Sequence, residues 1–143
     1  MAELYDVFQT APSLTALYMV SLQGWTNHNY KSLKDLSVLD GSLVLVTALP
    51  EMTGLKWLTI EYPCNSPIEI SKAVIHPGLT ALHCHCSWLQ MLETPALDDL
   101  TLYCADKAEP NFSVMLSFMK RLSCNLLCFT IVGAEAAIVV DHI

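Results

Sequence analysis

The sequence predicts an α/β fold in which about six strand-and-helix units are stacked along one parallel sheet. Three observations predict it. A Leu-x-x-Leu-x-apolar pattern recurs along nearly the whole of the 143-residue chain. Within each copy the apolar residues alternate, as expected of a strand with one buried face. Between the copies lie segments whose apolar spacing suits helices.

The repeated pattern begins at six leucines, namely Leu14, Leu33, Leu55, Leu79, Leu97 and Leu126. The copies read LTALYM, LKDLSV, LKWLTI, LTALHC, LDDLTL and LLCFTI, with phenylalanine replacing the second leucine in the last. Their intervals of 19, 22, 24, 18 and 29 residues match or lie close to the period of irregular leucine-rich repeats. Three copies share a proline two residues before the first leucine, at Pro12, Pro77 and Pro95.

Each unit would place a strand, a crossover and the next parallel strand in a right-handed arrangement. Repeating it predicts a leucine-rich-repeat solenoid, with a curved parallel sheet inside and helices outside, as one domain over residues 1–143. The segments expected to be helical are 42–49, 68–75, 88–94 and 111–123. In the last of these, one face would carry Phe112, Met115, Leu116 and Met119.

The two ends of the chain depart from the repeat. Residues 1–12 place Leu4, Val7 and Phe8 on one helical face, so they suit an N-terminal helical cap. The connector 21–32 has no clear helical face and is expected to be mostly loop. After Ile131 no further copy of the pattern is found, although the sequence stays apolar. The last repeat is therefore expected to be poorly covered, as in a fragment of a longer array.

Composition restricts the function classes. The chain has a net charge of -7, with 53% hydrophobic and 15% charged residues, which predicts a folded protein that repels nucleic acid. The most apolar stretch, 126–140, is interrupted by Glu135 and is too short to span a membrane. Glu3 and Asp6 do not suit a secretory signal, so the six cysteines are expected to be reduced, in the cytoplasm or the nucleus.

If the leucines point into the core, the intervening residues form three rows on the concave face of the sheet. The first row holds Ala16, Asp35, Trp57, Ala81, Asp99 and Cys128. The second holds Tyr18, Ser37, Thr59, His83, Thr101 and Thr130, and the third holds Val20, Leu39, Glu61, His85, Tyr103 and Val132.

No lysine or arginine occurs in these rows, so a protein segment or a small ligand suits them better than a polyanion. The candidate binding residues are Tyr18, Trp57, His83, His85 and Tyr103. Aromatic residues are common interface anchors, but they can also simply cover neighbouring strands. The face measures on the order of 400 Å², about half of what each partner contributes to a standard interface.

The sequence His83-Cys84-His85-Cys86 offers four metal-ligand residue types in succession. Strand alternation directs the two histidines to one face and the two cysteines to the other, so the four are not expected to close one metal site. Cys84 takes the place of a core residue, whereas Cys86 and Cys104 follow their strands at the place where leucine-rich repeats use a turn-satisfying Asn or Cys.

We find no phosphate-binding loop, nucleophile elbow or zinc-protease helix, and we expect no cofactor, metal or catalytic residue. Asp98 and Asp99 are adjacent in the sequence, which favours a solvated pair over a general acid and base. Cys124 and Cys128 lack a histidine partner that the pattern would place beside them. The residues therefore favour a binding protein over an enzyme.

Residues 12–132, with their P-x-L-x-x-L-x-apolar strands and the late segment NFSVMLSFMKRLSCNLLCFTI, resemble the leucine-rich region of fungal F-box proteins, especially those of mushroom-forming fungi. The resemblance implies the substrate-recognition arm of a Skp1-cullin-F-box ubiquitin ligase, or a shortened relative of it. An F-box itself is not visible, because Leu49-Pro50-Glu51 is only a weak imitation of its start, so Skp1 binding lacks its usual basis. Two alternatives remain: a small-ligand or metal-binding module using His83 and His85, and a degenerate repeat fragment without a partner.

Overall fold

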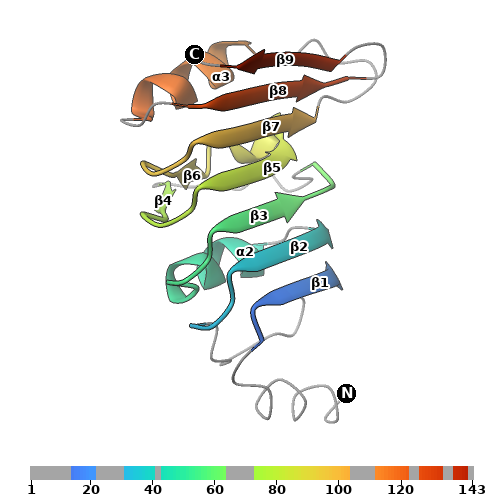
Figure 1. Cartoon of the computed structure of the whole chain (residues 1–143), viewed down its shortest axis with the longest axis vertical. Helices are drawn as coiled ribbons and strands as arrows, with labels where there is room; N and C mark the ends of the chain where they lie inside the picture. The colour runs from blue at the N-terminus through green and yellow to red at the C-terminus, as the bar shows by residue number, and fades with distance from the viewer. Residues whose placement is uncertain are drawn as a thin grey trace.

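The structure is a computed structural model that describes residues 14–21, 31–40, 43–63, 73–103, 112–122, 126–133 and 137–141. Its main sheet has seven strands in the order β1-β2-β3-β5-β7-β8-β9 (Figure 1). Six are parallel: β1 (Ala16–Ser21), β2 (Asp35–Asp40), β3 (Trp57–Ile60), β5 (Ala81–His85), β7 (Asp99–Tyr103) and β8 (Cys128–Val132). The predicted α/β class, with a mostly parallel sheet, is confirmed.

The remaining elements lie between or after these strands. They comprise α2 (Leu43–Ala48), the 3-10 turns η1 (Leu49–Glu51) and η2 (Cys86–Trp88), α3 (Phe112–Arg121), and the antiparallel strand β9 (Ala137–Asp141). Two short strands, β4 (Val74–Ile75) and β6 (Leu92–Glu93), pair in parallel as a second sheet. In the view of Figure 1, α2 and the β4-β6 pair lie behind the main sheet.

The register of the six parallel strands follows the predicted rows. Ala16 pairs with Asp35, Asp35 with Trp57, and the row continues through Ala81 and Asp99 to the start of β8. No bulge shifts one strand relative to the next in these pairings. Because side chains alternate along a strand, a shared register brings the same repeat positions into the same row.

One carbonyl just before each strand accepts two backbone N–H groups from the start of the next strand. The oxygen of Thr15 accepts from Lys34 and Asp35 at 2.8 and 2.9 Å. The same arrangement recurs at the next four boundaries, where the accepting carbonyls belong to Lys34, Lys56, Thr80 and Asp98. These paired bonds fix where each strand begins, and so fix the register.

The core lies on the face of the sheet that the helices and turns cover. The inward leucines Leu36, Leu58, Leu82 and Leu100 are at most 1% exposed. Beneath them the connector after β5 contributes Trp88, whose Nε1 donates to the carbonyl of Tyr62 at 2.9 Å. Burying a leucine side chain contributes roughly 1.5 to 3 kcal/mol, so the repeated leucines supply much of the stability.

The helix predicted over 111–123 is confirmed as α3, but its buried face differs from the prediction. Met115 and Phe118 face the core, whereas Leu116 is 59% exposed. The segment carries apolar residues on most of its circumference, so periodicity alone did not fix which of them would meet the sheet. The helix predicted over 42–49 is found as α2 followed directly by η1.

Two other helix predictions were wrong where the structure describes them. The segment 88–94 forms the end of η2, a turn and β6, and residues 74–75 of the segment 68–75 form β4. The two strands pair with each other across distant sequence, which a local apolar pattern cannot reveal. The strand β9 was also not expected, since it carries no copy of the repeat. The predicted cap at 1–12 and residues 22–30 of the predicted loop lie outside the described residues.

No helix in the described ranges has the length and the apolar character needed to cross a bilayer.

Candidate binding face

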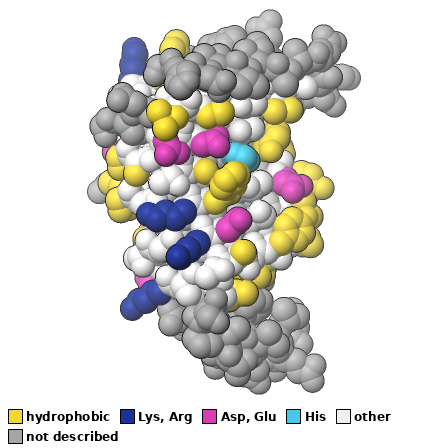
Figure 2. All heavy atoms as spheres, viewed as in Figure 1, with side chains coloured by type: hydrophobic (Ala, Val, Ile, Leu, Met, Phe, Trp, Pro, Cys, Tyr) yellow, Lys and Arg dark blue, Asp and Glu magenta, His cyan; other side chains and the backbone are white. Residues whose placement is uncertain are grey.

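We call the outward-pointing residues of the six parallel strands the open face, because the connecting helices and turns cover the opposite side. Figure 2 views this face and shows acidic side chains and a histidine around a central hydrophobic group. Tyr18 is 61% exposed, Val20 66% and Trp57 41%. These values are high for large apolar side chains, which makes the open face the candidate site.

Trp57 is held in place by two side-chain contacts. Its indole Nε1 donates to Thr59 Oγ1 at 3.2 Å, two residues further along β3. Its ring meets the imidazole of His83 on β5 edge to face, with centroids 4.9 Å apart and planes at 65°. Because both contacts lie on the sheet, the indole extends across the open face toward β5 and keeps part of its surface exposed.

His83 lies between Trp57 and an acid on the next strand. Its Nε2 is 3.8 Å from Asp99 Oδ1, which is too long for a hydrogen bond. The same nitrogen is shielded from solvent and has no hydrogen-bond partner among the described residues. The two side chains are 20% and 33% exposed. Trp57, His83 and Asp99 thus form a cluster across β3, β5 and β7, which we call the Trp57 cluster.

His85, the second predicted histidine, has a local structural role. Its Nδ1 accepts a hydrogen bond from the backbone N–H of Ser87 at 3.2 Å, and this bond caps the start of η2. The same nitrogen lies 3.0 Å from the Ser87 hydroxyl. Burial lowers the pKa of this imidazole, because it removes water that would otherwise stabilise the charged form. Its neutral form is the one that caps the turn.

The other predicted site residues are distributed along the sheet. Tyr18 lies on β1, two strands from Trp57, and Tyr103 is half-buried opposite His85 on β7. Of the five predicted residues, Trp57 and His83 are joined by a ring contact, and His85 and Tyr103 are paired in register. Asp99 joins Trp57 and His83 although the sequence pattern favoured a solvated pair with Asp98. The sequence already placed Trp57 and Asp99 in the same row of one face, but it did not select Asp99 as a binding residue.

Cys84 follows the predicted strand alternation, whereas Cys86 begins η2 and its Sγ lies 3.9 Å from His85 Nδ1. Cys84 is fully buried, and burial, followed by the nearby Cys86, raises the pKa of its thiol far above the usual range. A buried neutral thiol behaves as a small apolar residue. The described residues contain no group of three His, Cys, Asp or Glu side chains that could hold a metal ion. Cys104 and Cys124 lie outside the described residues.

Basic side chains gather beside the open face rather than on it. Lys31, Lys34 and Lys56 are exposed near the starts of the first strands, and Figure 2 shows basic side chains in dark blue along this edge. Lys56 Nζ donates to the carbonyl of Gly78 at 3.2 Å. The charge is therefore divided, with lysines near the starts of β2 and β3 and acids at Asp35 and Asp99 in the first row.

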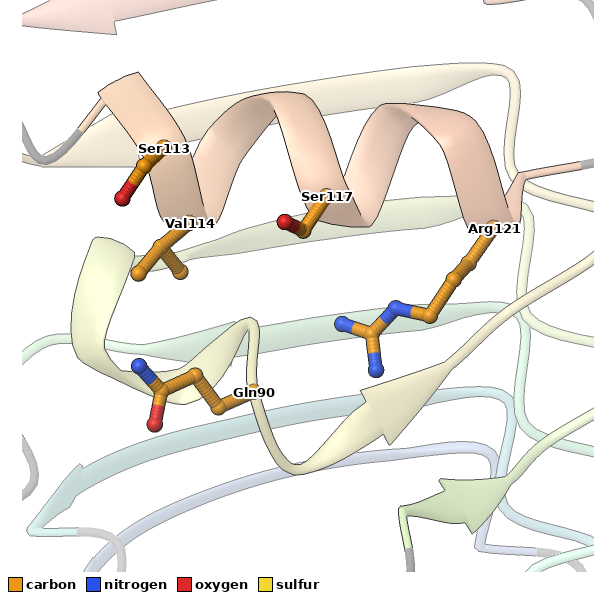
Figure 3. Close-up of a pocket in the computed structure, with 5 residues that line it drawn as sticks. All are labelled: Gln90, Ser113, Val114, Ser117 and Arg121. Carbon is orange, nitrogen blue, oxygen red and sulfur yellow. The ribbon is translucent and has the colours of Figure 1, made fainter.

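A pocket lies on the covered side, between α3 and the turn before β6 (Figure 3). It has a volume of about 280 Å³ and is lined by Gln90, Ser113, Val114, Ser117 and Arg121. Arg121 Nη2 donates to the Leu89 carbonyl at 2.7 Å, and its guanidinium lies 5.7 Å from the centre of the Phe118 ring. These contacts explain the arginine as a tie between α3 and the connector.

No family model, curated protein or solved structure matches this chain.

Proposed function

We propose that the chain is a non-enzymatic protein-interaction domain of the leucine-rich-repeat type, which binds its partner on the open face. The observation that carries the proposal is the common register of six parallel strands, which aligns exposed Tyr18, Val20 and Trp57 on one surface. Exposed aromatic side chains on a rigid sheet bind partners at a low cost in conformational entropy. The units would form a curved solenoid, with the open face on the concave side.

Within this proposal, the resemblance to fungal F-box proteins favours substrate recognition for a ubiquitin ligase, in the cytoplasm or nucleus. The resemblance covers the repeats and does not extend to the Skp1-docking part. Leu49–Glu51, the segment closest to an F-box start, forms a 3-10 turn closed by the bond from Met52 N–H to the Leu49 carbonyl. It belongs to a repeat connector, so Skp1 docking through this segment is not part of the proposal.

The size of the open face limits the affinity. At about 4.8 Å between strands, the face covers on the order of 400 Å², half of a standard partner surface. A short extended peptide fits this area better than a second folded domain. Stronger binding requires contacts from connectors at the strand ends, or several weak sites acting together.

Selection from a random peptide library displayed on phage tests the proposal. Peptides enriched on the wild-type protein should bind the double variant Tyr18→Ala/Trp57→Ala at least tenfold more weakly, a loss of about 1.4 kcal/mol. The matched control is Ile75→Ala/Leu116→Ala, which truncates two other exposed apolar side chains, on β4 and α3.

Equal loss of binding in both double variants would place the binding surface elsewhere. Failure to enrich any peptide on the wild-type protein would contradict the proposed role. Circular dichroism of each variant confirms that a loss of binding is not a loss of folding.

A further inference from the structure

The Trp57 cluster has a chemistry of its own within the open face. It offers a partly exposed indole, and a carboxylate that no described lysine or arginine neutralises within 4.0 Å. Asp35 adds a second exposed acid, directly opposite Trp57 on β2. No described position of the open face carries a positive charge other than a protonated histidine. The face therefore attracts cations.

We propose that the open face binds a basic segment of a partner protein and places an arginine side chain against the Trp57 indole and the Asp99 carboxylate. This inference rests on the proposed function, which it makes more specific. It commits to an extended segment bearing arginine because both contacts suit a guanidinium. The planar group stacks on an aromatic ring and accepts a carboxylate in a two-point hydrogen bond.

The spacing of the strands suits this occupant. Trp57 and Asp99 share a row but are separated by β5, so their backbone positions are roughly 10 Å apart. Between them, in that row, lies Ala81, a small residue that is 5% exposed. The His83 imidazole of the second row lies between the two groups, with its centroid 4.9 Å from that of the Trp57 ring and its Nε2 3.8 Å from Asp99 Oδ1. A guanidinium that contacts both groups would therefore lie over the His83 imidazole.

The division of charge also orients the segment. Lys34 and Lys56 lie just before the first row on β2 and β3, whereas Asp98 occupies the corresponding position on β7, next to Asp99 in the row itself. A cation of the partner is repelled near Lys34 and Lys56 and attracted near the acids of β7. The arginine should therefore lie on the β7 side of Trp57, with any acidic residue of the segment toward the lysines.

The test uses the full chain labelled with ¹⁵N and the probe acetyl-Gly-Arg-Gly-amide, followed through the Trp57 indole N–H signal. The variant Trp57→Phe assigns that signal among the three tryptophans. Titration with the arginine peptide should shift it saturably, while the buried Trp88 indole signal stays in place. The peptide with citrulline in place of arginine keeps the shape without the charge, and it should bind about three- to fivefold more weakly.

Asp99→Asn should weaken arginine-peptide binding by a similar factor, about three- to fivefold. The matched control is Glu93→Gln, which removes one negative charge from β6 of the second sheet and should leave binding within about 1.5-fold. Raising NaCl from about 50 to 500 mM should weaken the arginine peptide and not the citrulline peptide.

Equal affinity for the arginine and citrulline peptides would overturn the inference. Equal weakening by Asp99→Asn and Glu93→Gln would also overturn it, because attraction by net charge would then suffice. The phage selection separates this failure from failure of the proposed function. Selected peptides that bind the open face but contain no enriched basic residue would refute the arginine site and leave the interaction domain standing.

Discussion

The central strands and the outermost parallel strands carry the same repeat pattern in the same register, yet they are buried to different depths. Leu58 on β3 and Leu82 on β5 are 0% exposed. The corresponding residues of the outer strands, Leu17 on β1 and Phe129 on β8, are only partly buried. The repeat pattern therefore specifies a strand and its alignment, but it does not by itself specify burial.

The layer on the covered side buries the central strands more completely than it buries β8. β8 has a strand on each side, since β9 pairs with it, but Phe129 and Ile131 remain partly buried. The central strands instead lie over a layer that includes Leu45 of α2 and Trp88 of η2. Hydrogen bonds between strands satisfy the backbone, whereas contacts with a second layer remove apolar surface from water.

The largest effect that tests this comparison comes from truncating one leucine in each region. Leu58→Ala should lower the free energy of unfolding by about 2 to 5 kcal/mol, because the closed core leaves a cavity. Leu17→Ala, at the corresponding position of β1, should lower it by only about 1 kcal/mol, since partial exposure reduces both the transfer and the cavity contributions. Urea denaturation followed by circular dichroism measures both. Similar losses of unfolding free energy in the two variants would refute the idea that the two regions differ in depth of burial.

A smaller effect distinguishes two glycines that each precede the first leucine of a central repeat. A Cβ atom at Gly54 would lie 2.7 Å from the Lys31 carbonyl oxygen, a backbone atom that cannot easily move away. At Gly78 the nearest atom, Lys56 Nζ, is 3.6 Å away, which is ordinary contact. Gly54→Ala should therefore cost about 1 to 3 kcal/mol, and Gly78→Ala within about 0.5 kcal/mol. Thermal unfolding of the pair checks this, and equal stabilities would rule out the close approach.

The boundary between β1 and β2 can be weakened through one hydroxyl. Ser32 Oγ donates to the Leu14 carbonyl at 3.0 Å, just before the two strands begin. Ser32→Ala should cost about 1 kcal/mol. Hydrogen exchange should show the loss of protection in β1 amides, while β5 and β7 amides keep theirs. Equal loss of protection in all strands would show that the outer strand unfolds together with the centre.

The smallest expected effect is a dependence on pH. Burial lowers the pKa of His85 in the folded protein, so below pH about 6.5 the unfolded chain binds more protons at this site. Stability from this residue is fully present above that pH and is lost as the pH falls through the lower folded pKa. His85→Asn keeps an acceptor for the Ser87 N–H and should flatten this part of the stability curve, measured by denaturation between pH 7 and 5. An unchanged slope would contradict the assignment.

The amount that the sequence could predict differs between these features. The strands and their rows follow from the leucine spacing, because one residue of slip would expose an entire apolar set. The contact between Trp57 and His83 needed the cross-strand register, which the repeat supplied, and side-chain rotamers, which it did not. The capping role of His85 depends on the tight turn at Ser87, a local geometry that the pattern does not encode. The pairing of β4 with β6 joins segments 18 residues apart in the sequence, beyond the reach of local periodicity.

The shared carbonyls at the strand starts bear on how such a chain can change over evolution. They anchor each strand at its first residues, while the intervals between successive first residues vary from 18 to 29. An insertion in a connector is thus absorbed as a larger surface loop and does not displace the strand that follows, at an entropic cost that grows only slowly with length. Lineages can therefore add or lose connector residues, and so remodel the rim around the open face, without disturbing the alignment of Asp35, Trp57 and Asp99.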